Sequence, residues 1–224
     1  MFHKWQKYTV VFFSVLMLCI TGGWVYAQTA KPIVVIDPAH GGEDTGVLGV
    51  EKDLTLAIAL ALQKELAKEN SMEVVLTRNS DKALSLEERK EKILKIKPAI
   101  VLSLHINAGF GKNSSGFELY YPGFKALETS RKGEQEPVTG VGSHYLNDTV
   151  KLARIVQKNL DVLFPRKGRG LREAVVPLTE GVSVPVLVIE LGFATNSDEK
   201  KKLANGKTQA EIAKALAKSI KSFF

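Results

Sequence analysis

The chain has 224 residues, a net charge of +7 at neutral pH and a single cysteine, Cys19. This length fits one domain with a buried core, and the sequence contains no internal repeat or linker that would indicate a second module. One cysteine excludes an intrachain disulfide and a cysteine-type zinc site, so a metal would have to be held by histidine and carboxylate side chains. The moderate basic excess suits an anionic polymer or lipid head groups, whereas nucleic acid is a poor match because basic clusters interleaved with aromatic residues are missing.

Residues 1–27 are predicted to form a signal peptide. Lys4 and Lys7 precede an almost wholly apolar run over residues 9–20, and small or branched residues up to Ala27 occupy the cleavage-site positions. This order of charge, apolar core and small residues is typical of a secretory leader. The alternative is an uncleaved N-terminal anchor, because the apolar run and the residues after it could just span a bilayer. We therefore expect a secreted protein of the periplasm or cell envelope, with one catalytic domain over residues 28–224.

The rest of the chain alternates between apolar strand-like runs and stretches with helical spacing. The residues Ser85-Leu86-Glu87-Glu88 form a capping box, which predicts the start of a helix. Alternation of this kind predicts an α/β domain whose sheet contains parallel strands covered by helices. We expect strands at 33–37, 72–77, 99–104, 117–121, about 173–177 and 184–190, and helices at about 53–68, 85–96, 147–163, 197–199 and 208–223.

Residues 122–146 show neither helical nor strand periodicity. Gly, Ser, Glu, Lys and Thr dominate this stretch. A loop of this length inside a compact domain is usually functional or disordered. We interpret it as a loop that lines or gates a substrate groove, and a plain surface insertion is the alternative.

Three of the apolar runs lead into residues that can hold or assist a metal ion. The first leads through Asp37 to His40, the third to His105 and the last to Glu190. In open α/β sheets, ligands bind beyond the carboxyl ends of the strands. If these strands are neighbours, two imidazoles and a carboxylate meet at one edge of the sheet, which indicates a hydrolytic metal site.

The predicted metal ligands are His40, Glu51 and His105. Either histidine alone would more often be a structural residue, but both follow strand-like runs, and glycines after His40 let the backbone approach a ligand closely. Glu51 could simply favour the start of a helix, yet Asp53 is the better N-cap candidate and would leave Glu51 free. Together the three side chains would give a zinc site with an open fourth position.

Glu190 is predicted to be the catalytic residue. It follows a run of apolar residues, so its carboxylate is poorly solvated and suited to act as a general base and then a general acid. The alternative is a structural carboxylate paired with a buried Arg or Lys. Asn107 is a candidate for orienting His105 or for contacting substrate, and we expect His144 to be exposed.

Five motifs together resemble the zinc-dependent N-acetylmuramoyl-L-alanine amidases of bacterial cell walls. The resemblance covers about residue 32 to the C-terminus, except for 122–146. It implies Zn2+ bound by His40, Glu51 and His105, a catalytic Glu190, and a single α/β domain with a mixed, mostly parallel six-stranded sheet flanked by helices. Departures are Ala39 in place of a usual glycine and the absence of a frequent arginine from 176–180. The motifs are D-P-A-H-G-G at 37–42, G-V-E-K-D at 49–53, S-L-H-I-N-A at 103–108, R-G-L at 169–171 and V-P-V-L-V-I-E-L-G-F-A-T-N at 184–196.

The resemblance implies hydrolysis of the amide bond between N-acetylmuramic acid and L-alanine in peptidoglycan by a zinc-activated water. Cell-wall remodelling, daughter-cell separation or lysis would be its role. We expect a monomer that acts on peptidoglycan and not on nucleic acid, with an activator protein, if there is one, that the sequence does not identify. The alternatives are another zinc-dependent cell-wall peptidase, a catalytically inactive peptidoglycan-binding module, and a structural wall-anchored protein, the last of which leaves the four site residues unexplained.

Overall fold

A computed structural model describes residues 30–122, 141–164, 167–179 and 182–224 of the chain. The predicted signal peptide and most of the irregular stretch over 122–146 lie outside these residues, so both interpretations stay predictions. In the ranges just given, no helix is both long and apolar enough to cross a membrane.

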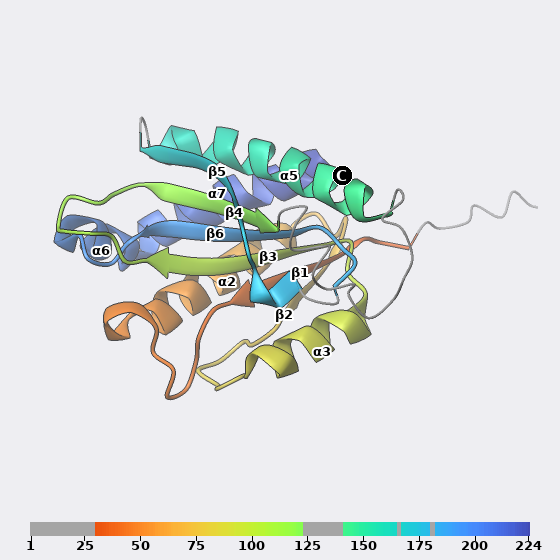
Figure 1. The fold of residues 1–224 in the computed structure, drawn as a ribbon, viewed down its shortest axis with the longest axis horizontal. Helices are drawn as coiled ribbons and strands as arrows, with labels where there is room; N and C mark the ends of the chain where they lie inside the picture. Colours follow the sequence, from red (N-terminus) through yellow and green to blue (C-terminus); the bar gives the residue numbers. More distant parts are fainter. Residues whose placement is uncertain (1–29, 123–140, 165–166, 180–181) are drawn as a thin grey trace, which may run out of the picture. The chain divides into compact units, whose positions relative to one another are not determined.

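Six strands form one mixed sheet in the order β2-β1-β3-β6-β4-β5 (Figure 1). Strands β2, β1, β3 and β6 run parallel to one another, β4 is antiparallel to β6, and β5 is parallel to β4. The prediction of a mixed, mostly parallel six-stranded α/β sheet is therefore confirmed. The strands are β1 Ile33–Pro38, β2 Glu73–Leu76, β3 Ile100–Asn107, β4 Phe117–Pro122, β5 Gly168–Ala174 and β6 Val186–Phe193.

Helices cover both faces of this sheet, and the two faces differ in how much is covered. The helical segments are η1 Val47–Gly49, α2 Glu51–Leu66, α3 Leu86–Ile96, α5 Val141–Leu163, η2 Pro177–Thr179, α6 Ser197–Leu203 and α7 Gly206–Phe223. Helices α2, α5 and α7 pack against one another and against one face of the sheet, while α3 and η2 lie on the other. We call these the α7 face and the α3 face.

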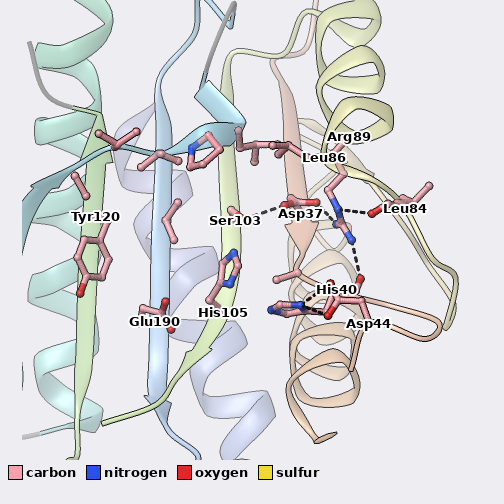
Figure 2. A pocket seen from close by; sticks show the side chains of 17 residues that line it. Asp37, His40, Asp44, Leu84, Leu86, Arg89, Ser103, His105, Tyr120 and Glu190 are labelled. Carbon is pink, nitrogen blue, oxygen red and sulfur yellow. Dashed lines mark hydrogen bonds and ion pairs between the residues drawn. The ribbon is translucent and has the colours of Figure 1, made fainter. Parts of the chain in front are cut away.

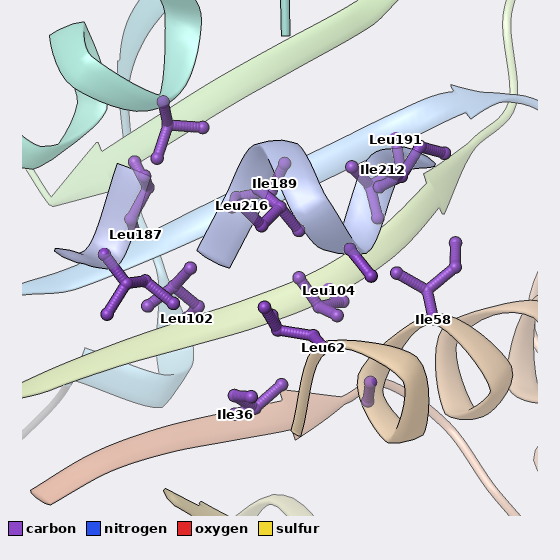
Figure 3. Close-up of a cluster of buried hydrophobic side chains, with 14 of the residues drawn as sticks. Ile36, Ile58, Leu62, Leu102, Leu104, Leu187, Ile189, Leu191, Ile212 and Leu216 are labelled. Carbon is purple, nitrogen blue, oxygen red and sulfur yellow. The ribbon is translucent and has the colours of Figure 1, made fainter. Parts of the chain in front are cut away.

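The main hydrophobic core lies under the α7 face. There Leu102, Leu104 and Ile189 of the central strands meet Leu62 of α2 and Leu216 of α7 (Figure 3). Side chains alternate along a strand, so the residues between these point to the opposite face. On the α3 face a smaller cluster joins three valines of the central strands to Ile93 of α3, namely Val35, Val101 and Val186. Burial on both faces explains why these strands appear in the sequence as continuous apolar runs.

On the α3 face, the side chains of the central strands change from apolar to polar toward the carboxyl ends of the strands. Two residues after Val35 comes Asp37, and two after Val101 comes Ser103, so both project to the same face as the valines. The next positions with this alternation are His105 on β3 and Glu190 on β6, which lie opposite each other in the parallel register. The predicted site residues of these strands therefore share one face near the carboxyl ends of β3 and β6.

Helix α3 begins as predicted, but α5 does not. The Ser85 hydroxyl accepts a hydrogen bond from the Glu88 amide at 3.2 Å, and the Glu88 carboxylate accepts one from the Ser85 amide at 2.7 Å, which completes the capping box. Helix α5 starts at Val141, so the prediction that residues 147 and 148 cap it is wrong. Buried Leu146, which precedes the predicted start, extends the apolar stripe of the helix toward its N-terminus, and this burial favours a helix although Gly142 and Ser143 weaken the sequence periodicity.

Three further boundaries differ from the predictions. Asp53 is not an N-cap, because α2 already begins at Glu51 and Asp53 lies in its first turn. Strands β3 and β6 continue past His105 and Glu190, so these residues lie within the strands and not at their ends. Strand β5 covers residues 168–174, and 177–179 form a short helix in place of the end of the predicted strand.

Candidate active site

His40, Glu51 and His105 meet in a compact cluster on the α3 face. The Nε2 atom of His40 lies 3.0 Å from Oε2 of Glu51, and Nδ1 of His105 lies 3.1 Å from Oε1 of the same carboxylate. One ligand atom from each residue falls within 4.8 Å of the others. The two imidazole rings approach at 5.7 Å between centroids and are nearly perpendicular (Figure 2). The structure thus brings together the three residues that the sequence predicts as metal ligands.

The loop between β1 and α2 needs an unusual backbone to place His40. His40 itself has a φ of 60°, a left-handed conformation that is rare for residues other than glycine. Gly46 has a φ of 66°, and a Cβ atom there would lie 2.5 Å from Oε2 of Glu51 and 2.7 Å from Cδ2 of His40. Only glycine at position 46 therefore lets the carboxylate and the imidazole come together.

Glu51 is buried yet held in its charged form. Its side chain is 2% exposed, and its two oxygens accept hydrogen bonds from the amides of Val47 at 2.9 Å and Ile106 at 3.1 Å. Burial by itself would raise the pKa of Glu51, but the hydrogen bonds from His105, His40 and these amides outweigh it and hold the pKa well below its ordinary value. A buried carboxylate with one negative charge is thus available to a cation.

Asp44 orients His40 from the side opposite Glu51. Both carboxylate oxygens of Asp44 lie 2.8 Å from Nδ1 of His40, which leaves Nε2 facing the cluster. The hydrogen bond to Glu51, with help from Asp44 and against burial, raises the pKa of His40 to about 9. A carboxylate behind a metal-binding histidine is a common arrangement that fixes the ring. Asp44 could not be predicted from the sequence, because an acidic residue in a Gly-rich loop carries no distinctive spacing.

Buried arginines anchor the loop that carries His40. Asp37 accepts a hydrogen bond from Arg89 Nη1 at 2.5 Å and another from Ser103 at 2.9 Å. Arg89 also donates to the carbonyl of His40 at 2.6 Å, and Arg78 donates to the carbonyl of Ala39 at 2.7 Å. Asp37 therefore serves to anchor the loop, while His40 points into the cluster.

Glu190 lies beside the cluster, and one of its carboxylate oxygens is buried. Its Cα pairs with that of His105 across β3 and β6, and its Oε2 atom is buried with no partner among the described residues. Burial raises the pKa of Glu190 to about 7, against the opposing effect of His105. A carboxyl group with such a pKa can both accept and donate a proton near neutral pH. An unsatisfied buried oxygen next to a cluster of metal-type ligands indicates that a further group binds here.

A pocket of about 520 Å³ opens over these residues (Figure 2). Glu190, His105 and His40 lie along its lining from the middle of the sheet to the β1 loop, and apolar side chains of η2 and α3 form much of the remaining wall. Apolar lining with a few convergent polar groups is typical of a site for an organic substrate.

Asn107 and His144 contribute differently from the predicted metal ligands. Asn107 donates from Nδ2 to Oε2 of Glu118 at 2.7 Å, so its side-chain amide binds Glu118. The same oxygen accepts a 2.6 Å hydrogen bond from the hydroxyl of Tyr120, which lines the pocket. Glu118 was not among the residues predicted from the sequence, although a charged residue within the otherwise uncharged run 117–122 could have indicated a functional position. The His144 side chain lies outside the described residues.

Comparison with known proteins identifies the family. Residues 34–222 match the family described as N-acetylmuramoyl-L-alanine amidase. The chain belongs to this amidase family. It is 32% identical over 205 residues to the protein YqiI of Bacillus subtilis, covering 88% of this chain and 89% of that one. It is also 31% identical over 196 residues to the N-acetylmuramoyl-L-alanine amidase CwlM of Bacillus licheniformis, covering 85% and 68%.

A solved structure of an amidase shares the fold. The crystal structure of N-acetylmuramoyl-L-alanine amidase from Clostridium difficile 630 matches this chain with a TM-score of 0.72 and 27% sequence identity. The match covers 87% of this chain and 97% of the other. The α/β architecture of the chain is thus that of an amidase catalytic domain.

Proposed function

We propose that the chain is a zinc-dependent N-acetylmuramoyl-L-alanine amidase that hydrolyses the bond between N-acetylmuramic acid and L-alanine in peptidoglycan. The observation that carries this proposal is the position of Glu190, whose buried Oε2 atom has no hydrogen-bond partner among the described residues, next to the His40–Glu51–His105 cluster in a pocket. Family membership over residues 34–222 supports the same activity.

The donor set favours Zn2+ over Mg²⁺ and Ca²⁺. Two imidazole nitrogens and one carboxylate oxygen are a usual set for catalytic zinc, whereas Mg²⁺ and Ca²⁺ prefer oxygen ligands. The described residues place no cysteine near the cluster that could compete as a ligand, since Cys19 is the only cysteine of the chain. When bound, Zn2+ supplies a Lewis acid that polarises the scissile carbonyl and favours attack by water at neutral pH.

Side chains of the protein would fill the remaining catalytic roles. Glu190 accepts a proton from the attacking water and returns it to the nitrogen of the departing alanine, which its pKa of about 7 allows. Glu51 stays charged through its amide hydrogen bonds, and Asp44 holds the His40 ring so that Nε2 faces the ion. Apolar side chains of the pocket wall limit access of bulk water to the reacting groups.

Digestion of purified peptidoglycan, followed by mass analysis of the released material, tests this activity. We expect intact stem peptides with a free N-terminal alanine and glycan strands that keep their lactyl groups. Protein that has been treated with a chelator should release none until zinc is added back. Peptides cut within the stem would instead indicate a wall peptidase, and binding without any release would indicate an inactive binding module.

Activity outside the cytoplasm requires export, and we propose that residues 1–27 act as the export signal and residues 28–224 as the catalytic domain. Lys4 and Lys7 followed by the apolar run support this part of the proposal. N-terminal sequencing of the protein recovered from the cell envelope tests it. A start near residue 28 is expected for a cleaved signal, and an intact Met1 would indicate an anchor.

A further inference from the structure

The row of acidic groups at the site continues beyond Glu190 across the sheet. Glu190 on β6 lies directly opposite His105 on β3 and opposite Glu118 on β4. Directly opposed residues of neighbouring strands project to the same face, so Glu118 is on the α3 face with the metal cluster. Tyr120, two residues further on β4, is on this face as well and lies beside Glu190 in the pocket wall (Figure 2).

Two arginines of β5 end this row. Arg169 Nη1 lies 3.6 Å and Arg172 Nη2 lies 3.4 Å from the same oxygen, Oε1 of Glu118. The Glu118 side chain is 5% exposed, but those of Arg169 and Arg172 are 40% and 50% exposed. Both guanidinium groups therefore reach the buried carboxylate and also present N–H groups to solvent.

A bulge in β5 is what puts both arginines on one face. Residues three apart on a regular strand point to opposite faces. Here Phe117 pairs with Gly168 and Leu119 pairs with Leu171, so two residues of β5 oppose Glu118 alone. The extra residue is Gly170, whose φ of 84° is in the region that favours glycine, although a Cβ atom there would meet nothing within 4 Å. Glycine at position 170 is thus required by the backbone conformation and not by close packing. The bulge places the side chains of Arg169 and Arg172 on the face that carries Glu118.

Charge compensation of Glu118 alone does not explain why two arginines lie next to it. Glu118 carries one charge, and its other oxygen is already bound by Asn107 and Tyr120. One guanidinium would compensate the remaining oxygen, and a second leaves a positive charge and unused donors exposed to solvent. Arg169 is further held with its guanidinium carbon 4.6 Å from the ring centroid of Phe193, which reduces the freedom it would lose on binding. Two exposed guanidinium groups are suited to bind a carboxylate in bidentate fashion.

We propose that Arg169 and Arg172 form a subsite for a carboxylate of the stem peptide, and this assignment rests on the proposed amidase function. Strand β5 lies two strands from β6, which corresponds to about 10 Å at the usual spacing of about 4.8 Å. An extended peptide advances about 3.3–3.6 Å per residue, so a substrate bound with its scissile amide at Glu190 would bring its second or third residue to the arginines. Both residues are acidic in stem peptides that contain γ-linked D-glutamate followed by diaminopimelate.

Soluble N-acetylmuramoyl tripeptides that differ in single groups test this proposal. The reference substrate carries a free carboxylate on the second residue and diaminopimelate with a free side-chain carboxylate as the third. One analogue has the second-residue carboxylate converted to an amide, and another has the diaminopimelate carboxylate converted to an amide. We expect kcat/KM of the wild-type enzyme to fall by about tenfold, mainly through KM, for the analogue whose contacted carboxylate is lost. The analogue that is affected identifies the source of the carboxylate.

Variants then link the preference to the arginines. Arg172→Gln and Arg169→Gln should each reduce the ratio of kcat/KM between the reference substrate and the affected analogue to about twofold or less. Arg172→Lys keeps the positive charge but cannot make the bidentate contact of a guanidinium, so it should retain part of this ratio. Each single variant leaves Glu118 with the other arginine, Asn107 and Tyr120, so the fold should persist, which thermal unfolding checks. Arg154→Gln, an exposed arginine of α5 on the α7 face, is the matched control and should discriminate as the wild type does.

The outcomes separate the subsite from the activity. Wild-type enzyme that cleaves all three substrates equally well would overturn the subsite while leaving the amidase function intact. An equal loss of kcat/KM on every substrate in the two glutamine variants would also overturn it, because the arginines would then act only through Glu118. No cleavage of the muramoyl–alanine bond in any substrate would overturn the proposed function and the subsite with it.

Discussion

On the α7 face the central strands stay apolar to their ends, whereas on the α3 face the same strands change from valine to polar and ionisable residues. Leu104 and Ile106 of β3 continue the core under α2 and α7, while Ser103 and His105, which alternate with them along the strand, face the pocket. Because alternate residues of one strand serve the two faces, the core and the site are built into the same six to eight residues of backbone.

The difference in covering elements explains where the site can form. Helices α2, α5 and α7 bury the apolar residues of β3 and β6 on their face, while on the opposite face α3 and η2 pack against the valine-rich part of the strands. Beyond these valines, among the described residues, the α3 face opens into the pocket, where Glu190 and the two histidines gather beside Glu51. Rigid neighbours on the buried face thus support ionisable groups on the open one, which the following substitutions of adjacent residues test.

The largest contrast is expected between His105 and its neighbour Leu104. His105→Ala removes a proposed ligand, so zinc content and amidase activity should be lost while the metal-free protein unfolds at nearly the same denaturant concentration as wild type. Leu104→Ala leaves a cavity in the core and should cost about 2–5 kcal/mol of unfolding free energy, yet the folded variant should retain zinc. Metal analysis, activity and urea unfolding measure the two effects. Full activity after exhaustive chelation would contradict the metal assignment.

Glu190 and Ile189 give the next contrast. Glu190→Gln keeps the shape but not the proton transfer, so kcat should fall by about 10²–10⁴-fold with zinc binding unchanged. Ile189→Val, on the α7 face, should cost only about 0.5–1.5 kcal/mol of stability and leave kcat as it is. If the Glu190→Gln enzyme loses its metal, Glu190 is a ligand, and Glu51 becomes the candidate base.

The fold could be predicted from the sequence because its signals are local. Runs such as 33–37 and 99–104 are apolar on both faces and are bounded by loops, and the capping box at Ser85 marks a helix start within four residues. The start of α5 could not be predicted in the same way. Gly142 and Ser143 weaken the helical period there, and tertiary packing of Leu146 decides the outcome.

The site was predictable where an ionisable residue follows an apolar run in the sequence, and not where it depends on strand register. His40, His105 and Glu190 each follow an apolar run, so the sequence indicates them directly. The Glu118–Arg169–Arg172 group depends on how β5 pairs with β4 across a long connection and on one extra residue at Gly170. Nothing local in the sequence specifies that pairing, and a shift of one residue would send Arg169 to the other face.

A smaller effect is expected for Asp44, which supports a ligand without being one. Asp44→Asn should weaken zinc affinity by about 10–100-fold, because the His40 ring loses its charged partner at Nδ1. Asp53→Asn is the matched control, since Asp53 is an exposed acid in the first turn of α2. Competition with a chromophoric chelator measures both affinities. Equal affinities of the two variants would remove Asp44 from the metal site.

The smallest effect concerns the stability of the metal-free protein and depends on pH. Burial raises the pKa of Glu190 to about 7 from an ordinary value of 4.5, so between these values the folded chain holds a proton that the unfolded chain has released. The unfolding free energy contributed by this group therefore falls as the pH rises through that window and stays low above it.

Glu190→Gln removes the titrating carboxyl group, so it should also remove the loss of unfolding free energy at high pH. The chelated variant should be more stable than chelated wild type by on the order of 1–3 kcal/mol at pH 8, and about equally stable near pH 4, where the carboxyl is protonated in both states. Glu173→Gln, which replaces an exposed carboxyl on β5, should show no such change between the two pH values. Urea unfolding at both pH values measures the difference.

A gain of the same size at pH 4 and pH 8 would mean that the variant acts through packing and that the buried charge of Glu190 does not lower the stability of the fold. A gain confined to high pH would instead show that the open end of the α3 face keeps an unpartnered carboxylate at the expense of stability, unlike the apolar face behind it.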